Sequence, residues 1–464
     1  MAYSTHDLND TIVALATPPG TGALGIIRLS GKDAIDIVNG VFPAKDLAKQ
    51  ASHTIHFGTI RDAHNKIVDE VLVSLFVAPK SYTGEHVVEV SCHGSSFIIQ
   101  QLIELFIQQG ARLARHGEFT LRAFLNGRMD LSQAEAVADL IASDSQKSHD
   151  IAIQQMRGGF SDEIKALRQQ LLDFASLIEL ELDFAEEDVE FANREELKKL
   201  VEKIQSIIKA LVQSFQLGNV IKNGVSTVIA GRPNAGKSTL LNALLNEERA
   251  IVSEIAGTTR DTIEEVLNIQ GIQFRLIDTA GIREAQDQIE VIGVEKTMQK
   301  IQQSSLLVYV FDVIQTPPEE VYKDLEKLVQ PGIHLLAVAN KMDLNPYTKY
   351  EHYASDLLLE AQFVPISAIN QMNIDYLKEK LYDAVISEKI KLENTIVTNA
   401  RHYDALQKAH ASLTDVLTGM DQGITSDFIA MDIRRALSFL GEITGEISTE
   451  DLLGNIFGRF CIGK

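Results

Sequence analysis

The sequence predicts a multidomain α+β protein in which an α/β domain is inserted into a discontinuous all-helical domain, after an N-terminal α+β domain. The order of sequence patterns indicates this. Short β-rich runs come first, then a helical period, then strands alternating with helices, and finally the helical period again. In addition, 464 residues exceed what one hydrophobic core usually serves. We expect domain limits at 1–120, 121–218, 219–385 and 386–464, with the second and fourth segments forming the helical domain.

The composition argues against several classes of protein. A net charge of −21 opposes general binding to nucleic acid because polyanions repel each other, although a local basic groove or a basic partner is still compatible. No apolar run reaches the roughly 18 residues that a membrane-spanning helix needs. The polar start of the chain is unlike a signal peptide. Two cysteines, Cys92 and Cys461, cannot form a disulfide framework. We therefore expect a cytoplasmic protein with no membrane segment.

Two regions of the chain carry strand-like runs. In residues 1–120 the runs "TIVALAT", "GALGIIRLS", "VDEVLVSLFVA" and "HVVEVSCHG" are separated by glycine and proline, which is typical of an α+β domain. In residues 219–385 the runs "VSTVIAG", "FRLIDTAG", "SLLVYVFDV", "HLLAVANK" and "QFVPISA" alternate with helical segments. This alternation indicates βαβ units and a mostly parallel sheet.

The helical pattern begins near residue 131. Ser132 and Glu135 have the spacing of a capping box, so we expect Ser132 to cap a helix there. Further along, apolar residues recur at the helical spacing at Ile164, Leu167, Leu171, Phe174 and Ile178.

A phosphate-binding pattern stands at the start of the inserted domain. "GRPNAGKST" at 231–239 matches G-x-x-x-x-G-K-[ST], and a predicted strand precedes it while a predicted helix follows. The glycines let the backbone N–H groups point at phosphate oxygens, Lys237 adds a positive charge, and the Ser238 hydroxyl is suited to bind Mg²⁺. The residues predicted to bind nucleotide here are Asn234, Ala235, Gly236, Lys237, Ser238 and Thr239.

Two motifs that follow are suited to the γ-phosphate and its metal ion. "GTTRD" supplies Thr258 and Thr259 in a predicted switch loop. "DTAG" follows a predicted strand, where Asp278 would hold Mg²⁺ and Gly281 would offer its N–H to the γ-phosphate. The other nucleotide-binding candidates in this motif are Thr279 and Ala280.

Two later motifs predict recognition of guanine. In "NKMD", the Asp343 carboxylate accepts two hydrogen bonds from the N1–H and 2-amino groups of guanine. Adenine lacks both donors at those positions, so buried polar groups would be left unpaired and GTP is expected instead of ATP. "SA" fits the loop near the guanine O6. The candidate residues are Asn340, Lys341, Asp343, Ser367 and Ala368.

The position that often carries a water-orienting glutamine is occupied by Ile282, which cannot hydrogen-bond water. The missing polar groups must therefore come from elsewhere. Asn234 is placed to ligate a monovalent cation beside the phosphates, or is a turn residue. Glu284, Asp287 and Glu290 are the candidates for positioning the attacking water, and each alone is also compatible with a solvated surface acid.

At this point the chain resembles the MnmE (TrmE) family of tRNA-modification GTPases along its whole length. The resemblance is carried by "IVALATPPGTGALGIIRLSG", "GEFTLRAFLNGRMDLSQAEAVADLI", "AGRPNAGKSTLLNALL", "AIVSEIAGTTRD", "DTAGIRE" and "EITGEISTEDLLGNIFGRFCIGK". It implies a cytoplasmic homodimer paired through N-terminal domains that resemble folate-binding proteins. It also implies a 5-formyl-tetrahydrofolate-type one-carbon donor, bound by Arg28, Glu89, Arg128 and Lys464.

The resemblance further implies a potassium-dependent P-loop GTPase, with a metal site in the inserted domain. The implied ligands are Ser238 and Thr259 for Mg²⁺, and Asn234, Ser253, Ile255 and Thr258 for K⁺, with Ser253 also near the nucleotide. Glu290 matches the acid near the attacking water. With a flavin-containing MnmG subunit, in a heterotetramer, the family adds an aminomethyl or carboxymethylaminomethyl group to C5 of the wobble uridine of certain tRNAs. A ribosome-assembly GTPase is the alternative, because it can share the "PNAGKS" loop.

Cys461 lies near the end of the chain in "FCIGK" and has three interpretations. Lipidation is disfavoured because Gly463 is not aliphatic and no polybasic tract precedes it. A packed thiol is the plain alternative. The resemblance favours a third interpretation, in which the tail folds back to the folate pocket and brings Cys461 and Lys464 near the one-carbon donor. We therefore take Cys461 as a candidate catalytic residue.

Overall fold

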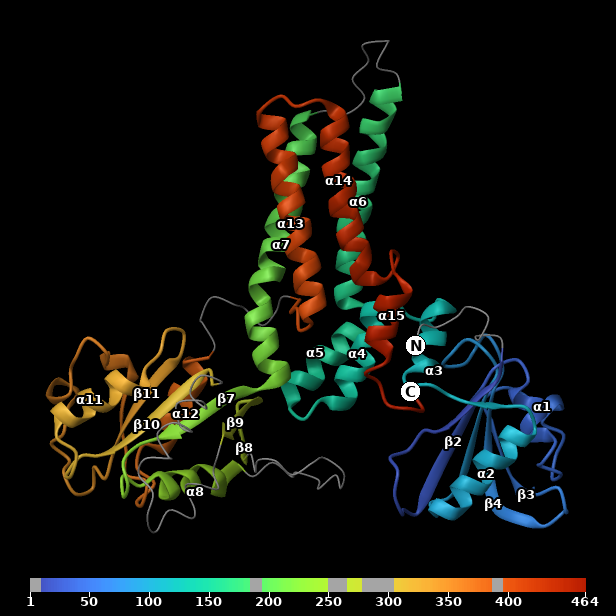
Figure 1. The fold of residues 1–464 in the computed structure, drawn as a ribbon, viewed down its shortest axis with the longest axis horizontal. Helices are drawn as coiled ribbons and strands as arrows, with labels where there is room; N and C mark the ends of the chain where they lie inside the picture. Colours follow the sequence, from blue (N-terminus) through green and yellow to red (C-terminus); the bar gives the residue numbers. More distant parts are fainter. Residues whose placement is uncertain (1–9, 184–193, 249–264, 278–303, 386–394) are drawn as a thin grey trace. The chain divides into compact units, whose positions relative to one another are not determined.

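The computed structural model describes residues 10–183, 194–248, 265–277, 304–385 and 395–464 (Figure 1). The chain divides into two compact units. The first comprises Met1–Ile141, Ala152–Ile204 and Lys408–Lys464, and the second Ala142–Ile151 and Gln205–Gln407. The described residues form many helices and two six-stranded sheets, so the predicted multidomain α+β class is confirmed. The four domain limits stay a prediction.

The first unit contains a sheet of strand order β3-β4-β5-β2-β1-β6, antiparallel except for the parallel pairing of β6 with β1. Its strands are β1 (Ile12–Leu15), β2 (Leu24–Ser30), β3 (Thr54–Arg61), β4 (Ile67–Phe76), β5 (Val87–His93) and β6 (Arg112–Leu113). Strands β3 and β6 are not among the four predicted runs. Strand β3 was not predicted, although more exposed and more buried residues alternate along its length.

Helices cover one face of this sheet, and on the other face Phe119 of α3 (Glu118–Leu125) packs beside Ile12 and Ala14 of β1. The helices α1 (Ala34–Asn39) and α2 (Ser96–Gln108) pack on the alternate strand residues that point toward them. The opposite face of β3 and β4 leaves the large apolar side chains of Ile55, Phe57 and Leu72 exposed. Phe57 and Leu72 are direct cross-strand partners. The β3–β4 part of this face is therefore an apolar surface that none of the described residues covers, and we call it the open sheet face.

Helices complete the first unit. They are η2 (Leu47–Lys49), α3 (Glu118–Leu125), α4 (Leu131–Ala142), α6 (Gly159–Asp183), α14 (Ser426–Thr444) and α15 (Glu450–Phe457), while α5 (Gln146–Met156), α7 (Arg194–Asn223) and α13 (Ala400–Asp421) have residues in both units. The helices α6 and α14 pack against each other. The predicted apolar stripe of α6 is buried, except that Phe174 is half-buried.

The expected cap of α4 at Ser132 is wrong. The helix begins at Leu131, and the side chain of Asp130 accepts hydrogen bonds from Gln133 N at 3.0 Å and Ser132 Oγ at 2.8 Å. Ser132 is buried inside the first turn. Aspartate is as good a cap as serine, and Asp130 stands where the preceding loop ends, so it takes the role.

The second unit contains a sheet of order β12-β11-β10-β7-β9-β8, parallel except for the antiparallel edge strand β8. Its strands are β7 (Val225–Ala230), β8 (Glu265–Ile269), β9 (Ile272–Ile277), β10 (Leu306–Asp312), β11 (His334–Asn340) and β12 (Phe363–Pro365). The five predicted runs are strands and the sheet is mostly parallel, as expected. Strand β8 was not predicted.

Both faces of this sheet are covered (Figure 1). Helices α8 (Lys237–Glu248) and α12 (Ile374–Asp383) contribute to the core on one face. Helix α11 (Pro318–Leu328) packs on the other face, together with apolar residues near η4 (Tyr350–His352) and η5 (Glu360–Gln362). The strands buried between these layers read as nearly continuous apolar runs, as parallel strands do. Loops at their carboxyl ends are therefore held on a rigid scaffold.

Within the described part of the chain, none of the helices combines the length and the apolar character needed to cross a bilayer.

Candidate functional site

The phosphate-binding loop connects β7 to α8, as its pattern predicts. Gly231 has φ +152°, and a Cβ there would lie 2.1 Å from the carbonyl oxygen of Val310 on β10. Gly236 has φ +95°, and a Cβ there would lie 2.2 Å from Nδ2 of Asn340 on β11. Both glycines are therefore required by backbone conformation and by close approach to neighbouring strands. Together they place the loop at the carboxyl edge of the parallel sheet.

Lys237 is held inside this loop. Its Nζ donates hydrogen bonds to the carbonyl oxygens of Gly231 at 2.7 Å and Arg232 at 2.8 Å. Burial lowers the pKa of Lys237, since the charged form loses hydration. Two backbone carbonyls thus replace part of that hydration. Phosphate oxygens carry more negative charge than carbonyls and suit the same ammonium group, so the loop fits a polyphosphate.

Asn340 joins the phosphate loop to the predicted guanine loop. This side chain is buried, its Nδ2 donates to the Ala235 carbonyl at 2.8 Å, and its Oδ1 accepts from the Ala368 N–H at 3.0 Å. In the same loop, the Ser367 hydroxyl donates to Asp343 Oδ1 at 2.6 Å. Two loops that are far apart in sequence are therefore locked together, and the Asp343 carboxylate has a fixed orientation.

Lys341 adopts φ +70° and its Nζ donates to Asp312 Oδ2 at 2.7 Å. Burial opposes ionisation of Asp312, but the Lys341 hydrogen bond and a backbone N–H outweigh it and lower the pKa of that carboxyl. Asn234 is exposed with φ +62°, the left-handed conformation in which asparagine is common in turns, and its role as a cation ligand stays a prediction. Ser238 and Thr239 lie in the first turn of α8, half-buried and exposed respectively.

The other predicted residues of this site lie outside the described residues. They are Ser253, Ile255, Thr258, Thr259, Asp278, Thr279, Ala280, Gly281, Glu284, Asp287 and Glu290. The predicted Mg²⁺ and K⁺ sites and the water-positioning acid therefore stay predictions.

The N-terminal domain contains the second predicted site. The pairing of β2 with β5 sets Arg28 opposite Glu89, and the Arg28 Nε and Nη2 atoms each lie 2.8 Å from Glu89 Oε1. The Arg28 guanidinium also stacks over the rings of Tyr82 and Phe119, 5.5 and 5.7 Å from their centroids. Burial raises the pKa of the Tyr82 hydroxyl. Arg28 and Glu89 thus form a half-buried charged pair beside the rings of Tyr82 and Phe119, which we call the aromatic floor. We call these four residues the Arg28 pocket.

The tail of the chain packs against this pocket. The Arg28 Nη1 atom donates to the Gly463 carbonyl at 3.3 Å. Gly463 has φ +97°, and a Cβ there would lie 2.2 Å from the Leu15 carbonyl oxygen. His116 forms an antiparallel bridge with Ile462, so the tail adds a short strand-like contact to the domain. The tail position is therefore specified by backbone contacts that leave no room for a side chain at 463.

Of the remaining predicted pocket residues, Cys461 and Lys464 belong to the tail, and Arg128 lies in another loop. Cys461 is exposed, and its carbonyl accepts from the Gly117 N–H at 3.3 Å. Lys464 is half-buried. Arg128 is exposed in the loop after α3, where its stem lies beside Gly84. The structure thus brings Arg28, Glu89 and the tail together.

A buried ionic cluster, which the sequence analysis missed, lies on α3 beside the pocket. Arg122 is only 1% exposed and its Nη2 lies 3.1 Å from Glu118 Oε1 and 3.0 Å from Asp10 Oδ1. Arg112 binds the same two carboxylates. Burial opposes ionisation of Glu118, but its hydrogen bond from Arg112 outweighs this and lowers the pKa. The sequence does contain one sign of this cluster. Glu118 and Arg122 form an i,i+4 pair of opposite charge within the apolar segment "EFTLRAFL".

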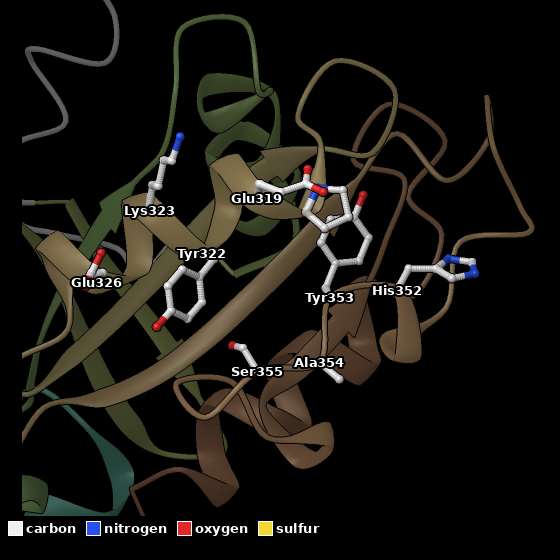
Figure 2. A pocket seen from close by; sticks show the side chains of 9 residues that line it. Glu319, Tyr322, Lys323, Glu326, His352, Tyr353, Ala354 and Ser355 are labelled. Atoms are coloured by element: carbon white, nitrogen blue, oxygen red, sulfur yellow. The ribbon is translucent and has the colours of Figure 1, made fainter.

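A hollow of about 430 Å³ lies between α11 and residues 352–355 (Figure 2). Figure 2 shows acidic, basic and aromatic side chains around it, including Glu319, Lys323 and Tyr353. None of the predicted site residues lines this hollow, so we assign no part of the predicted chemistry to it.

Comparisons with known proteins cover the whole chain. Residues 11–128 match the family described as "GTP-binding protein TrmE N-terminus", and residues 131–461 match "MnmE helical domain". The chain is 56% identical over 455 residues to the tRNA modification GTPase MnmE of Cytophaga hutchinsonii, covering 98% of each chain. It is 54% identical over 469 residues to that of Flavobacterium johnsoniae, covering 98% of this chain and 99% of the relative. Among solved structures, the G domain of the T. maritima FeoB iron transporter is 24% identical, with a TM-score of 0.26, covering 35% of this chain and 99% of that one.

Proposed function

The chain belongs to the MnmE (TrmE) family of tRNA modification GTPases, and from this we propose that it hydrolyses GTP in the course of tRNA modification. The observation that supports GTP as its nucleotide is the connection made by Asn340. This side chain ties the phosphate loop around Lys237 to the loop in which Ser367 orients Asp343. A phosphate-binding group and a guanine-selective carboxylate are thus held on one rigid edge of the sheet.

Lys237, Asp343 and Asn340 have different roles in the proposed binding of GTP. Lys237 would add a phosphate oxygen to the Gly231 and Arg232 carbonyls that it already bonds, because its ammonium group has three N–H donors. Asp343 accepts from the N1–H and 2-amino groups of guanine, and its bond from Ser367 fixes the plane of the carboxylate. The buried side chain of Asn340 sets the distance between these two functions.

We further propose that K⁺ and Mg²⁺ assist hydrolysis. Ser238 and Thr259 would hold Mg²⁺, while Asn234, Ser253, Ile255 and Thr258 would hold K⁺. The cations supply positive charge where negative charge develops between the β- and γ-phosphates. Two observations support this. Asn234 is exposed on the phosphate loop, and Ile282 stands where a polar residue is usual. Glu290 would position the attacking water.

The potassium proposal is tested by the rate of GTP hydrolysis in KCl against NaCl, with and without Asn234→Ala. We expect wild-type hydrolysis to be faster in KCl by roughly tenfold or more, and the variant to lose this preference while it still binds GDP. Equal rates in the two salts would overturn the proposal.

We propose that two copies of the chain pair through their N-terminal domains. The open sheet face supports this, because exposed apolar side chains on adjacent strands are typical of an interface. Sedimentation of the full chain tests it. Phe57→Glu should shift the protein from dimer to monomer, whereas Lys66→Glu, at an exposed position just before β4, should not. A Phe57→Glu protein that stays a dimer would place the interface elsewhere.

We propose that the Arg28 pocket binds a 5-formyl-tetrahydrofolate-type donor through Arg28, Glu89, Arg128 and Lys464. A carboxylate and a guanidinium pair well with the amino-pyrimidinone edge of a pterin, and the aromatic floor suits a flat ring. Calorimetry with 5-formyl-tetrahydrofolate tests this. Glu89→Gln should weaken binding roughly tenfold or more, since one acceptor of a charge-assisted pair is lost. Unchanged affinity would remove the pocket from the proposal.

We propose that Cys461 acts in the modification chemistry, at the entrance to this pocket. Replacement by serine should abolish tRNA modification and leave GTP hydrolysis within about twofold of wild type, because the two sites lie in different domains. Modification by the serine variant would exclude a reactive thiol.

For the modification itself, we propose that the chain acts with a flavin-containing MnmG subunit, in a heterotetramer, on C5 of the wobble uridine of certain tRNAs. Relatives match 98% of the chain, so the ribosome-assembly alternative, which leaves the flanking segments unexplained, is not retained. Nucleoside analysis of tRNA from a deletion strain decides the point. Expression of this chain should restore the aminomethyl or carboxymethylaminomethyl uridine, and a strain that never loses the modified nucleoside would contradict the proposal.

A further inference from the structure

Arg232 follows the first glycine of the phosphate loop, and its side chain leaves the loop toward α11. Its Nε lies 2.7 Å from Asp324 Oδ2 and its Nη2 lies 3.1 Å from Asp324 Oδ1, a two-pronged pair. Its Nη1 also bonds the Glu320 carboxylate. Glu320 and Asp324 are one helical turn apart, so two carboxylates on one face of α11 bond all three nitrogens of the guanidinium.

Asp324 is in turn anchored to the core of the sheet. The hydroxyl of Tyr309 on β10 donates to Asp324 Oδ2 at 2.7 Å, and the Tyr309 ring is almost fully buried. Burial opposes ionisation of Asp324, but the hydrogen bonds from Arg232 and Tyr309 outweigh it and lower the pKa of this carboxyl. Arg232 and Glu320 are partly exposed, but the Asp324 end of the ion pair is anchored to a buried strand through Tyr309.

The backbone of Arg232 contacts the phosphate-binding lysine. Its carbonyl oxygen is one of the two that accept from Lys237 Nζ, at 2.8 Å. The contacts of the Arg232 side chain therefore also hold in place one of the two acceptors of Lys237. From these contacts we propose that Arg232, Asp324, Glu320 and Tyr309 form a clamp that positions the phosphate loop for nucleotide, with Arg232 as a positioning residue that does not itself contact the phosphates.

This proposal rests on the proposed function, since it requires that the loop bind GTP and GDP. The test is stopped-flow release of a fluorescent GDP from the full chain. Asp324→Asn removes the charge of the gripping group, and Tyr309→Phe keeps the buried ring and deletes only the hydroxyl. We expect release to accelerate roughly tenfold for Asp324→Asn and about threefold for Tyr309→Phe. Preference for guanine over adenine nucleotides should not change, because Asp343 lies in another loop.

Further variants separate positioning from general charge effects. Glu326→Gln is the matched control, since Glu326 lies on the same helix and lines the hollow of Figure 2; it should leave GDP release within about twofold of wild type. Arg232→Lys keeps the charge but not the two-pronged geometry, so its GDP release should be faster than that of wild type and slower than that of Arg232→Gln. The double variant Arg232→Gln with Asp324→Asn should be no faster than the worse single variant.

Two results would overturn the clamp. One is unchanged GDP release in folded Asp324→Asn and Arg232→Gln proteins. The other is an equal effect of Glu326→Gln. In both cases the proposed function survives, because the wild-type protein binds GDP. A wild-type protein that binds no GDP would overturn the proposed function together with the clamp.

Discussion

The phosphate loop and the Arg28 pocket are built in opposite ways. The loop is shaped by two glycines and a lysine within seven residues, then tied to its neighbours by the buried amide of Asn340. The pocket joins residues that are remote in sequence, and its hydrogen bond between Arg28 and Gly463 spans 435 residues. A local loop keeps its form wherever the sheet is intact. An assembled pocket depends on every segment that reaches it, so the two sites should fail in different ways.

The largest expected effect comes from overfilling the local site. Gly236→Ala places a Cβ about where the Asn340 amide sits, in a backbone conformation that disfavours alanine, so it breaks both the loop and its tie. We expect GDP affinity to fall about a thousandfold, which titration calorimetry measures. Gly332→Ala is the matched control, because it has a similar φ and open space around it. A loss of affinity in the control as well would mean that backbone strain alone is responsible.

The same steric test can be applied to the assembled site. Gly463→Ala would push a methyl group into the Leu15 carbonyl and displace the tail from Arg28. We expect tRNA modification to drop about a hundredfold while GTP hydrolysis stays within about twofold of wild type. Nucleoside analysis and a phosphate-release assay measure the two quantities. Gly454→Ala, in α15 with no atoms near its Cβ, should change neither. Parallel loss of both activities would show that the sites are not separable.

A third comparison is between a buried and an exposed carboxylate of the N-terminal domain. Glu118 is the buried one, in the ionic cluster on α3. Because the folded-state pKa of Glu118 is lowered, its ionised form stabilises the fold above the ordinary carboxyl range, and this contribution is lost as the pH falls through the folded pKa. Glu118→Gln should therefore reduce stability by about 2 kcal/mol at neutral pH and flatten the acid limb of the unfolding curve. Urea unfolding at several pH values checks this. Glu104→Gln on the exposed face of α2 should leave that limb unchanged.

The smallest expected effect concerns the orientation of Asp343. Ser367→Ala removes a 2.6 Å hydrogen bond but leaves the carboxylate able to reach guanine. We expect GDP to bind about fivefold more weakly, corresponding to about 1 kcal/mol, with selectivity against ADP retained. Competition binding against both nucleotides measures this. An unchanged GDP affinity would mean that the backbone of the loop alone orients Asp343.

The contrast between local and assembled sites also explains what the sequence could predict. The phosphate loop, Asp343 and Ser367 follow from short motifs whose spacing is set by backbone geometry, so their placement at one sheet edge was predictable. The hydrogen bonds of Asn340 and the ion pairs of Arg232 could not be predicted, because they depend on which side chains meet across strands and helices. The ionic cluster around Arg122 was missed for the same reason.

Some elements of the fold were hidden by competing local signals. Ser132 and Asp130 both suit a helix start, and only the path of the loop after α3 decides in favour of Asp130. Strand β8 is an antiparallel edge strand whose partner, β9, lies only two residues further on. The alternation of strands and helices that revealed the parallel sheet does not signal such a hairpin.

The position of the tail has a consequence for biosynthesis. Phe460, Ile462 and Gly463 contact His116 and Arg28, residues that leave the ribosome more than three hundred positions earlier. The nucleotide loop, in contrast, is complete as soon as its own sheet has been translated. A chain interrupted before residue 460 would therefore contain the whole phosphate loop and yet lack the tail contact of the Arg28 pocket, so the two proposed sites become complete at different stages of translation.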